Sequence, residues 1–257
     1  MVRSPKRLKG GRRPERRGGG ERAPTPEQGW IWGVHACLAA LANPRRDIRR
    51  IVATRNAALR LPADNGGVDI LEAAEIDALL PPGAVHQGLA MRPGPLEAFD
   101  LEETCAPADG RPVIVLDQVT DPQNVGAVFR SAAAFGARAI VMQDRHAPAL
   151  TGALAKAAAG AIEIVPHVSV VNIARAIEQL GELGYLTIAL EGEAAQDLAE
   201  VIDGSVALVL GAEGRGLREL VSKTCAARAR IPIAPEMESL NIAAAAAVAL
   251  YEAGRKR

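Results

Sequence analysis

The second half of the chain alternates between short, continuously apolar runs and longer segments in which apolar residues recur every three or four positions. The first pattern is typical of strands buried on both faces, and the second of helices with one buried side. The pattern predicts strands at residues 113–117, 139–142, 162–165, 185–190, 206–211 and 230–233. It predicts helices at residues 125–135, 150–159, 170–183, 217–224 and 241–253. This order indicates an α/β fold with a parallel sheet covered by helices on both faces.

A smaller α/β unit is predicted ahead of this region. The pattern predicts helices at residues 33–41 and 72–80 and strands at residues 48–53 and 84–91. Both helices are followed by prolines, which stop a helix. Residues 97–110 are rich in acids, proline and alanine and lack periodicity, so they are predicted to be a linker. The chain is therefore expected to hold two domains, at residues 30–96 and 111–257.

Charge is spread unevenly along a chain whose formal net charge is zero. Residues 1–29 hold nine Lys or Arg and three Glu, so this segment carries +6 and the remainder −6. With so few apolar residues the segment is predicted to be a disordered basic arm. Two interpretations of the arm stay open, namely phosphate contacts with RNA and a solubilising extension without further function. Its glutamates and glycine clusters disfavour a mitochondrial transit peptide.

Composition excludes several classes of protein. A hydrophobic content of 49% supports buried cores, and an aromatic content of 3% means that the cores are mostly aliphatic. The three cysteines (Cys37, Cys105 and Cys225) are far apart, so we expect reduced, buried thiols in the cytoplasm and neither a disulfide frame nor a metal site. Neither a membrane span nor a secretory signal is expected, because uninterrupted apolar runs of the necessary length are missing.

The first motif follows the predicted strand at residues 113–117 and reads Asp121-Pro122-Gln123-Asn124-Val125-Gly126, with Arg130 further along. Asn124 is predicted to cap the helix, and Gly126 to allow a close approach to another backbone or to RNA. Four apolar residues should form the buried stripe of that helix: Val125, Val128, Phe129 and Ala132. Arg130 lies off the stripe and should project from it. The alternative is an ordinary helix cap with a surface arginine.

Two further motifs follow. Gly211, Gly214 and Gly216 come directly after an apolar strand, with Glu213 among them. Their G-x-x-G-x-G spacing matches neither the dinucleotide-binding fingerprint nor a P-loop. The third motif begins at Ile231-Pro232 and leads to Glu238-Ser239-Leu240-Asn241, where Ser239 or Asn241 is a candidate cap for the last helix.

These three motifs, in this order and at about this separation, resemble those of the SpoU/TrmH family of RNA ribose 2′-O-methyltransferases. The resemblance implies S-adenosylmethionine as cofactor, a deep trefoil knot, and homodimers whose sites draw on both subunits. Periodicity and spacing do not indicate a knot. A catalytically silent RNA-binding module of the same fold is the alternative, but it should have lost the polar residues Arg130, Glu213 and Asn241. A dehydrogenase would need the dinucleotide fingerprint, which is missing.

The resemblance also assigns individual residues. It places the catalytic group at Asn124, Arg130, Glu213, Ser239 and Asn241. It places the cofactor pocket at Gly211, Ile231 and Leu240, and it requires no metal. In the family, the arginine that matches Arg130 acts on the hydroxyl. Because arginine stays protonated up to about pH 12, we interpret Arg130 as a cation that lowers the hydroxyl's pKa and stabilises the alkoxide.

The first domain resembles the substrate-binding domain of ribosomal-RNA members of the family, which is similar to a ribosomal-protein RNA-binding fold. The matching segments are Trp32-Gly33-Val34-His35-Ala36, Asn43-Pro44-Arg45-Arg46 and His86-Gln87-Gly88. This favours a guanosine of 23S ribosomal RNA as the target, with transfer RNA as the alternative. The cluster Arg45, Arg46, Arg49 and Arg50 is predicted to contact phosphates, unless it is a solvated helix end. His35 and His86 are expected to be structural.

Overall fold

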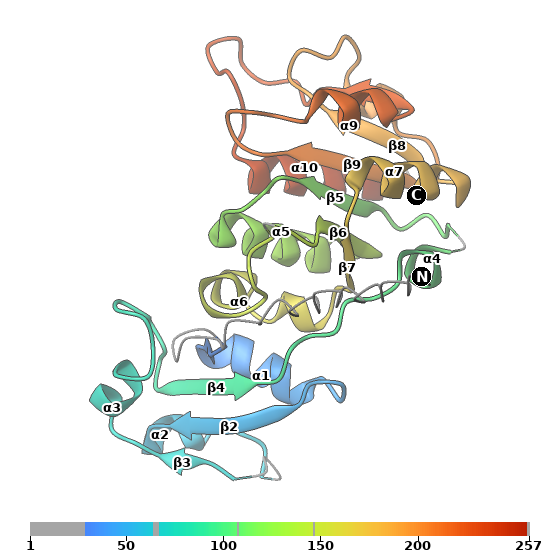
Figure 1. Cartoon of the computed structure of the whole chain (residues 1–257). Coiled ribbons are helices and arrows are strands. Elements are labelled where there is room, and N and C mark those ends of the chain that lie inside the picture. Colours follow the sequence, from blue (N-terminus) through green and yellow to red (C-terminus); the bar gives the residue numbers. More distant parts are fainter. Residues whose placement is uncertain (1–28, 64–66, 107, 146, 256–257) are drawn as a thin grey trace, which may run out of the picture.

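Two sheets organise the protein. The computed structural model describes residues 29–63, 67–106, 108–145 and 147–255, so the predicted basic arm lies outside it apart from Gly29. The smaller sheet has the order β1-β4-β2-β3, and the larger has the order β10-β8-β9-β5-β6-β7. In Figure 1 the small sheet lies at the bottom and the large one above it, with α1 and α6 between them.

The larger sheet is parallel throughout. Its strands are β5 (Val113–Asp117), β6 (Ala139–Gln143), β7 (His167–Val170), β8 (Leu186–Leu190), β9 (Val206–Gly211) and β10 (Ala227–Ala229). One apolar cluster packs α5 (Pro122–Ala134), α6 (Gly152–Ala158), α8 (Leu198–Val201) and α10 (Ile242–Arg255) on one face. A second cluster packs α4 (Leu101–Cys105), α7 (Ile173–Glu182) and α9 (Glu219–Thr224) on the other. The predicted parallel sheet with two covered faces is confirmed.

The smaller sheet is built from β1 (Ile31–Trp32), β2 (Ile48–Ala53), β3 (Asp69–Ile70) and β4 (Leu89–Pro93). Its helices are α1 (Val34–Ala42), α2 (Arg55–Ala58) and α3 (Ala73–Asp77). The strand predicted at residues 84–91 begins only at Leu89, because Gln87 has a φ of 56° and Gly88 a φ of 80°. This turn is fixed by His86, whose Nδ1 accepts from the Gly88 N–H (3.0 Å) and whose Nε2 lies 3.1 Å from Asp77 Oδ1. His86 is therefore structural, whereas His35 is exposed on α1.

Two predicted strands are wrong. Residues 162–165 are not a strand, because the left-handed residues Ala159 and Gly160 lead into a 3-10 turn, η1 (Ala161–Glu163), and β7 begins later. A strand was predicted at residues 230–233, but β10 covers Ala227–Ala229 and ends before that range. The segment at residues 97–110 contains the helix α4, and Phe99 pairs with Val168 at the start of β7.

The two sheets share one apolar core. Ile31, Cys37 and Leu89 of the small unit belong to the same buried cluster as Leu154 and Ala161 of the large one. A polar group, the seam cluster of Asn43, Arg46, Glu163 and His167, lies beside it. Arg46 Nε is 3.3 Å from Glu163 Oε1, with side-chain exposures of 1% and 2%, and Asn43 Nδ2 donates to Glu163 Oε2 at 2.8 Å.

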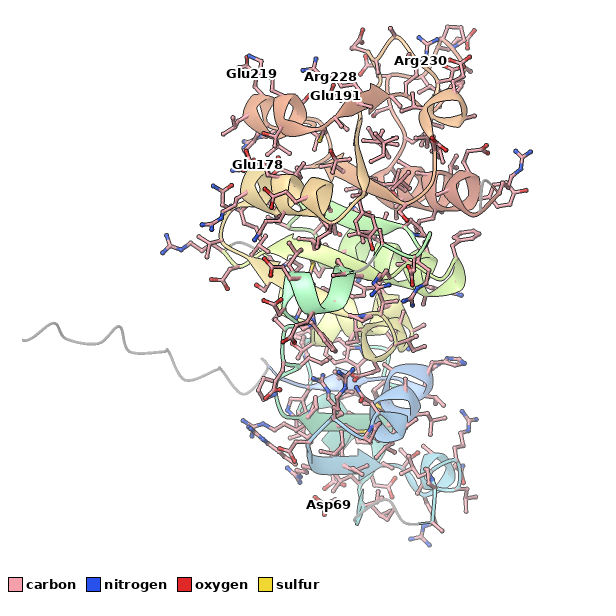
Figure 2. The ribbon with its side chains drawn as sticks, turned by 90° about the vertical axis from the view of Figure 1, so that its right-hand side faces the viewer. Asp69, Glu178, Glu191, Glu219, Arg228 and Arg230 are labelled. Carbon is pink, nitrogen blue, oxygen red and sulfur yellow. The ribbon has the colours of Figure 1, made fainter. Side chains whose placement is uncertain are left out.

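The predicted phosphate contact by Arg46 is therefore wrong, because the side chain is buried between the two units. Its neighbours are also paired within the protein. Arg45 lies 4.4 Å from the Phe99 ring centroid, and Arg49 and Arg50 form exposed ion pairs with Asp47 and Asp69. Figure 2 shows Asp69 at the opposite end of the molecule from Glu191, which lines the cavity described below.

The cysteines are all free thiols. Burial raises the pKa of Cys37 and Cys225 to about 12 and that of Cys105 to about 11. They stay protonated at neutral pH and are poor nucleophiles. Within the described ranges, no helix is long and apolar enough to cross a membrane.

Candidate active site

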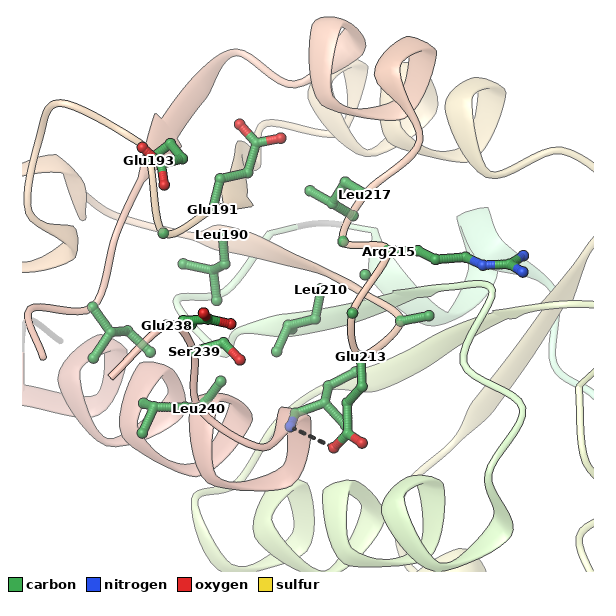
Figure 3. A pocket seen from close by; sticks show the side chains of 18 of the residues that line it. Leu190, Glu191, Glu193, Leu210, Glu213, Arg215, Leu217, Glu238, Ser239 and Leu240 are labelled. Atoms are coloured by element: carbon green, nitrogen blue, oxygen red, sulfur yellow. Dashed lines mark hydrogen bonds between the residues drawn. The ribbon is translucent and has the colours of Figure 1, made fainter. Parts of the chain in front are cut away.

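A cavity of about 600 Å³ opens at the carboxyl edge of the larger sheet. Three segments enclose it: residues 190–193 after β8, residues 210–217 after β9, and residues 238–240 ahead of α10 (Figure 3). Ligands of open α/β sheets bind at this edge, where successive loops diverge. The volume lies within the range of roughly 300–1,000 Å³ that is usual for small-molecule sites. The two sequence motifs that follow β9 and precede α10 thus meet in one place.

Each glycine of the second motif has a physical reason. A Cβ on Gly211 would collide with the backbone of Gly216, because the loop folds back on the end of β9. The Gly216 N–H donates to the Ala212 carbonyl at 2.8 Å, which closes the loop. Gly214 and Gly216 have φ values of 75° and 64°, which glycine adopts without strain. Gly211 lines the cavity with its backbone. A larger residue at this position would displace the loop at Gly216 and would not simply extend into the space for a ligand.

The predicted polar residues Asn124, Glu213 and Asn241 come together as one hydrogen-bonded group, which we call the catalytic cluster after the role predicted for its members. Asn241 Nδ2 donates to Glu213 Oε1 at 2.6 Å and to Asn124 Oδ1 at 2.9 Å. Asn124 Nδ2 donates to the same Glu213 oxygen at 3.2 Å. The Ile242 N–H lies 3.4 Å from that oxygen, as the dashed line in Figure 3 marks. The cluster therefore joins α5, the glycine loop and the start of α10.

Asn124 does not cap α5, contrary to the prediction. Asp121 is the capping residue, and its Oδ1 accepts from the Asn124 N–H at 2.8 Å. The Asn124 side chain is thereby left to meet Glu213. Asn241 caps α10 while it contacts Glu213, because its Oδ1 accepts from the Ala243 N–H at 2.9 Å. Gly126 serves close helix packing, since a Cβ there would lie 2.6 Å from the Leu154 carbonyl of α6.

The remaining cavity residues divide into apolar and acidic walls. Leu190, Leu210, Ile231 and Leu240 supply apolar surface, and Ser239 faces the same space. The segment Glu191-Gly192-Glu193 was not singled out from the sequence, although a glycine between two acids directly after a strand was an available signal. Arg215 of the glycine loop also lines the cavity, but its side chain points away from it in Figure 3.

Arg130 is not part of this cluster. It lies six residues beyond Asn124, about 9 Å along the helix axis, and it is exposed. Val125, Val128, Phe129 and Ala132 are buried, as predicted. The Arg130 side chain forms neither a hydrogen bond nor an ion pair with any residue in the described part of the chain.

The cavity fits S-adenosylmethionine on chemical grounds. Its apolar wall can pack against a purine, and its glutamates suit a positively charged sulfonium. Among the described residues, no group of three or more His, Cys, Asp or Glu is placed to hold a metal ion.

Comparison with known proteins agrees with this geometry. Residues 111–251 match the SpoU rRNA methylase family, and residues 30–98 match the substrate-binding domain of RNA 2′-O ribose methyltransferases. The chain is 39% identical to the 23S rRNA (guanosine-2′-O-)-methyltransferase RlmB of Vibrio cholerae, covering 88% of this chain and 96% of that protein. The corresponding Pseudomonas putida protein is 35% identical, with the same coverage. The AdoMet-bound rRNA methyltransferase of Sinorhizobium meliloti superposes with a TM-score of 0.73 at 25% identity, covering 88% and 86% of the two chains.

Fold and cavity thus define an RNA methyltransferase that uses S-adenosylmethionine. More narrowly, the chain belongs to the SpoU rRNA methylase family, as its motifs implied.

Proposed function

We propose that this protein methylates the ribose 2′-hydroxyl of a guanosine in 23S ribosomal RNA. The observation that carries the proposal is the catalytic cluster at the mouth of the cofactor cavity, built from all three sequence motifs. The substrate follows from relatives that bear this activity in their names and align over 88% of the chain. The match of residues 30–98 to a substrate-binding domain supports ribosomal RNA over transfer RNA, and it supports the division into domains at residues 30–96 and 111–257.

Each predicted site residue has a role in this proposal. S-adenosylmethionine supplies an activated methyl group when it is bound. Gly211, Ile231 and Leu240 line its pocket. Asn124 and Asn241 hold Glu213 by Oε1, which leaves Oε2 without a hydrogen bond among the described residues and open to a ribose hydroxyl. Ser239 helps to orient the same hydroxyl.

The 2′-oxygen forms a bond to the methyl group as the bond from that methyl group to the sulfonium breaks and leaves a neutral thioether, and the hydroxyl proton passes to solvent. A fixed cation beside the oxygen stabilises the developing alkoxide, and a rigid cluster places the oxygen in line with the methyl group. Arg130 is assigned the first task and the catalytic cluster the second.

Because Arg130 lies apart from the cluster of its own chain, we propose that it completes the site of a second subunit. The exposed sides of α5 and α10 would form the homodimer interface. Val248 and Tyr251 of α10 are 44% and 55% exposed, and Tyr251 packs edge-on against Phe135 at the end of α5. Helices α5 and α10 lie against each other, so an interface on them brings Arg130 to the partner. The trefoil knot and a cytoplasmic location belong to the same proposal and follow from the family alone.

The substrate is tested by mapping 2′-O-methylation in ribosomal and transfer RNA from cells with and without the protein. Loss of one guanosine modification in 23S RNA, restored by the wild type and not by Glu213→Gln, is the expected result. Loss in transfer RNA alone would contradict the ribosomal target.

The shared site is tested by mixing two inactive variants. Arg130→Ala removes the cation, and Ser239→Phe fills the cavity from an exposed position. Mixed dimers hold one complete site, so the mixture should regain about a quarter to a half of wild-type activity. Arg130→Ala mixed with Glu213→Gln is a second complementing pair. Arg130→Ala protein on its own should stay inactive. If the mixture of Arg130→Ala and Ser239→Phe also showed no activity, each site would use the arginine of its own subunit.

A further inference from the structure

The carboxylate of Asp117 was not singled out by any motif, yet it lies at the base of the cofactor loop. Asp117 is the last residue of the central strand β5, and its side chain is fully buried. In the sheet it stands opposite Gly211, the last residue of β9, where the loop at residues 212–217 begins. A buried, ionised carboxylate is costly unless it is paired and hydrogen-bonded.

The partner of Asp117 is the residue at which that loop ends. Arg218 donates its Nε to Asp117 Oδ1 at 2.9 Å and its Nη2 to the same oxygen at 2.5 Å. The Arg218 backbone N–H donates to Asp117 Oδ2 at 3.1 Å. Arg218 is also the residue that precedes the first turn of α9. The Asp117 carboxylate, which lies beside the start of the loop, therefore binds both the backbone and the side chain of Arg218 at the end of the loop.

The loop between these two points has few other restraints. Residues 213–216 are exposed, and two of them are glycines at positive φ, which lose the most conformational freedom on ordering. Apart from the catalytic cluster, the loop is closed by the Gly216–Ala212 hydrogen bond, which belongs to an isolated antiparallel bridge between these two residues. The same residues line the cavity and carry Glu213. The shape of the cofactor site thus depends on how firmly the two ends of the loop are held.

We propose that Asp117 and Arg218 are positioning residues for the cofactor loop, and that their ion pair sets the affinity for S-adenosylmethionine without contacting the reacting atoms. The proposal rests on the proposed function only for the identity of the cofactor. Because the pair holds the loop that lines the cofactor cavity, its loss should raise the KM for S-adenosylmethionine more than the KM for RNA.

The test is calorimetric titration of the full-length protein with S-adenosylmethionine, without RNA. Asp117→Asn keeps the shape of the side chain and leaves no buried charge, while the freed Arg218, 40% exposed, can be solvated. We expect affinity to fall at least tenfold. Asp109→Asn is the matched control, because Asp109 also pairs with arginines, at 2.8 Å from Arg111 Nε and 2.6 Å from Arg138 Nη1, but lies before the start of β5. Its affinity should stay within twofold of the wild type.

Three further readouts separate positioning from a general structural role. The KM for S-adenosylmethionine should rise in parallel with Kd, whereas kcat at saturating cofactor should change less than about threefold. Hydrogen exchange should accelerate in a peptide spanning residues 211–218 and not in β6. Arg218→Lys, which keeps the charge with fewer donors, should recover part of the affinity that Arg218→Gln loses.

Several outcomes would overturn the proposal. Folded Asp117→Asn that binds S-adenosylmethionine like the wild type would do so, as would a loss of kcat without a change in KM. If Asp117→Asn does not fold, Arg218→Lys decides the matter, and unchanged affinity in that variant overturns the idea. A wild-type protein that fails to bind S-adenosylmethionine would instead refute the proposed function.

Discussion

The seam cluster and the catalytic cluster are built alike but lie in opposite surroundings. Each joins side chains that are about a hundred residues apart: Asn43 and Arg46 with Glu163, and Asn124 with Glu213 and Asn241. The Arg46 and Glu163 side chains are almost fully buried, whereas the Asn124–Glu213–Asn241 hydrogen bonds are exposed beside a cavity. Because the seam cluster is buried, its side chains can interact only with each other, between the two sheets. Exposure leaves the second able to exchange partners with a ligand.

Removing one partner of the buried pair should have the largest effect. Arg46→Met leaves Glu163 as an unpaired buried carboxylate, so the free energy of unfolding should fall by about 3–5 kcal/mol. Urea denaturation measures it. Arg46→Met combined with Glu163→Gln should recover most of the loss, because the neutral amide keeps an acceptor for Asn43. Arg49→Met, whose ion pair is exposed, should change stability by less than about 1 kcal/mol. If Arg46→Met and Arg49→Met lowered the free energy of unfolding equally, burial of the seam cluster would not be what makes it stabilising.

The seam should also make stability depend on pH. Burial, aided by the charge of Arg46, lowers the pKa of His167 from 6.5 to about 4. The histidine is neutral in the folded protein at pH 5–6, whereas the unfolded chain binds a proton there. Its contribution is therefore fully present above about pH 6.5 and is lost as the pH falls toward 4, by at most about 3 kcal/mol. His167→Leu should flatten this slope in denaturation curves, and the exposed His35→Leu should not.

A change at the exposed Arg130 should lower activity and leave stability unchanged. Arg130→Ala should leave the melting temperature and cofactor affinity unchanged, because the side chain has no partner in the described part of the chain. Methyl transfer should fall on the order of a hundredfold, as for other groups that stabilise transition-state charge. Arg130→Lys should rescue it partly. Single-turnover rates measure the effect, with Arg60→Ala as the surface control. A wild-type rate for Arg130→Ala would exclude this residue from the mechanism.

The smallest effect is expected from the basic arm, which lies outside the described residues. If residues 1–29 bind phosphates, their deletion should flatten the log–log salt dependence of RNA binding by about 0.7–0.9 for each phosphate that the arm neutralises. Filter binding at several salt concentrations measures the slope. An unchanged slope would favour the interpretation of the arm as a solubilising extension.

Local pattern was enough for most of the helices and strands, whereas the candidate site residues needed the resemblance to a family. The apolar run at residues 113–117 and the helical stripe around Phe129 were predictable because their burial follows from sequence period. Gly211, Glu213 and Asn241 were found through the resemblance, and the structure brings the motifs together. The prediction failed for Arg46, because its partner Glu163 is more than a hundred residues away and no local pattern reveals it.

The errors around residue 162 have the same origin. Ile162 and Val165 are buried, as their apolar character suggested, but they fill the space between the two sheets from a turn rather than a strand. An apolar run reports burial and not the conformation in which it is achieved. Asp117 was overlooked for a related reason. A single acid at the end of a strand forms no sequence pattern, and its partner Arg218 lies far along the chain.

The core that the two sheets share has a consequence for synthesis. A ribosome releases the small domain first, at roughly 5–20 residues per second. The side of α1 that faces α6 finds its neighbours only after Leu154 and Ala161 have left the exit tunnel. For several seconds the nascent chain therefore exposes Cys37, Ala40 and their apolar surroundings to solvent, and such exposed apolar surface is prone to aggregation. Pausing of translation between codons 98 and 161 would prolong that interval, and faster elongation would shorten it.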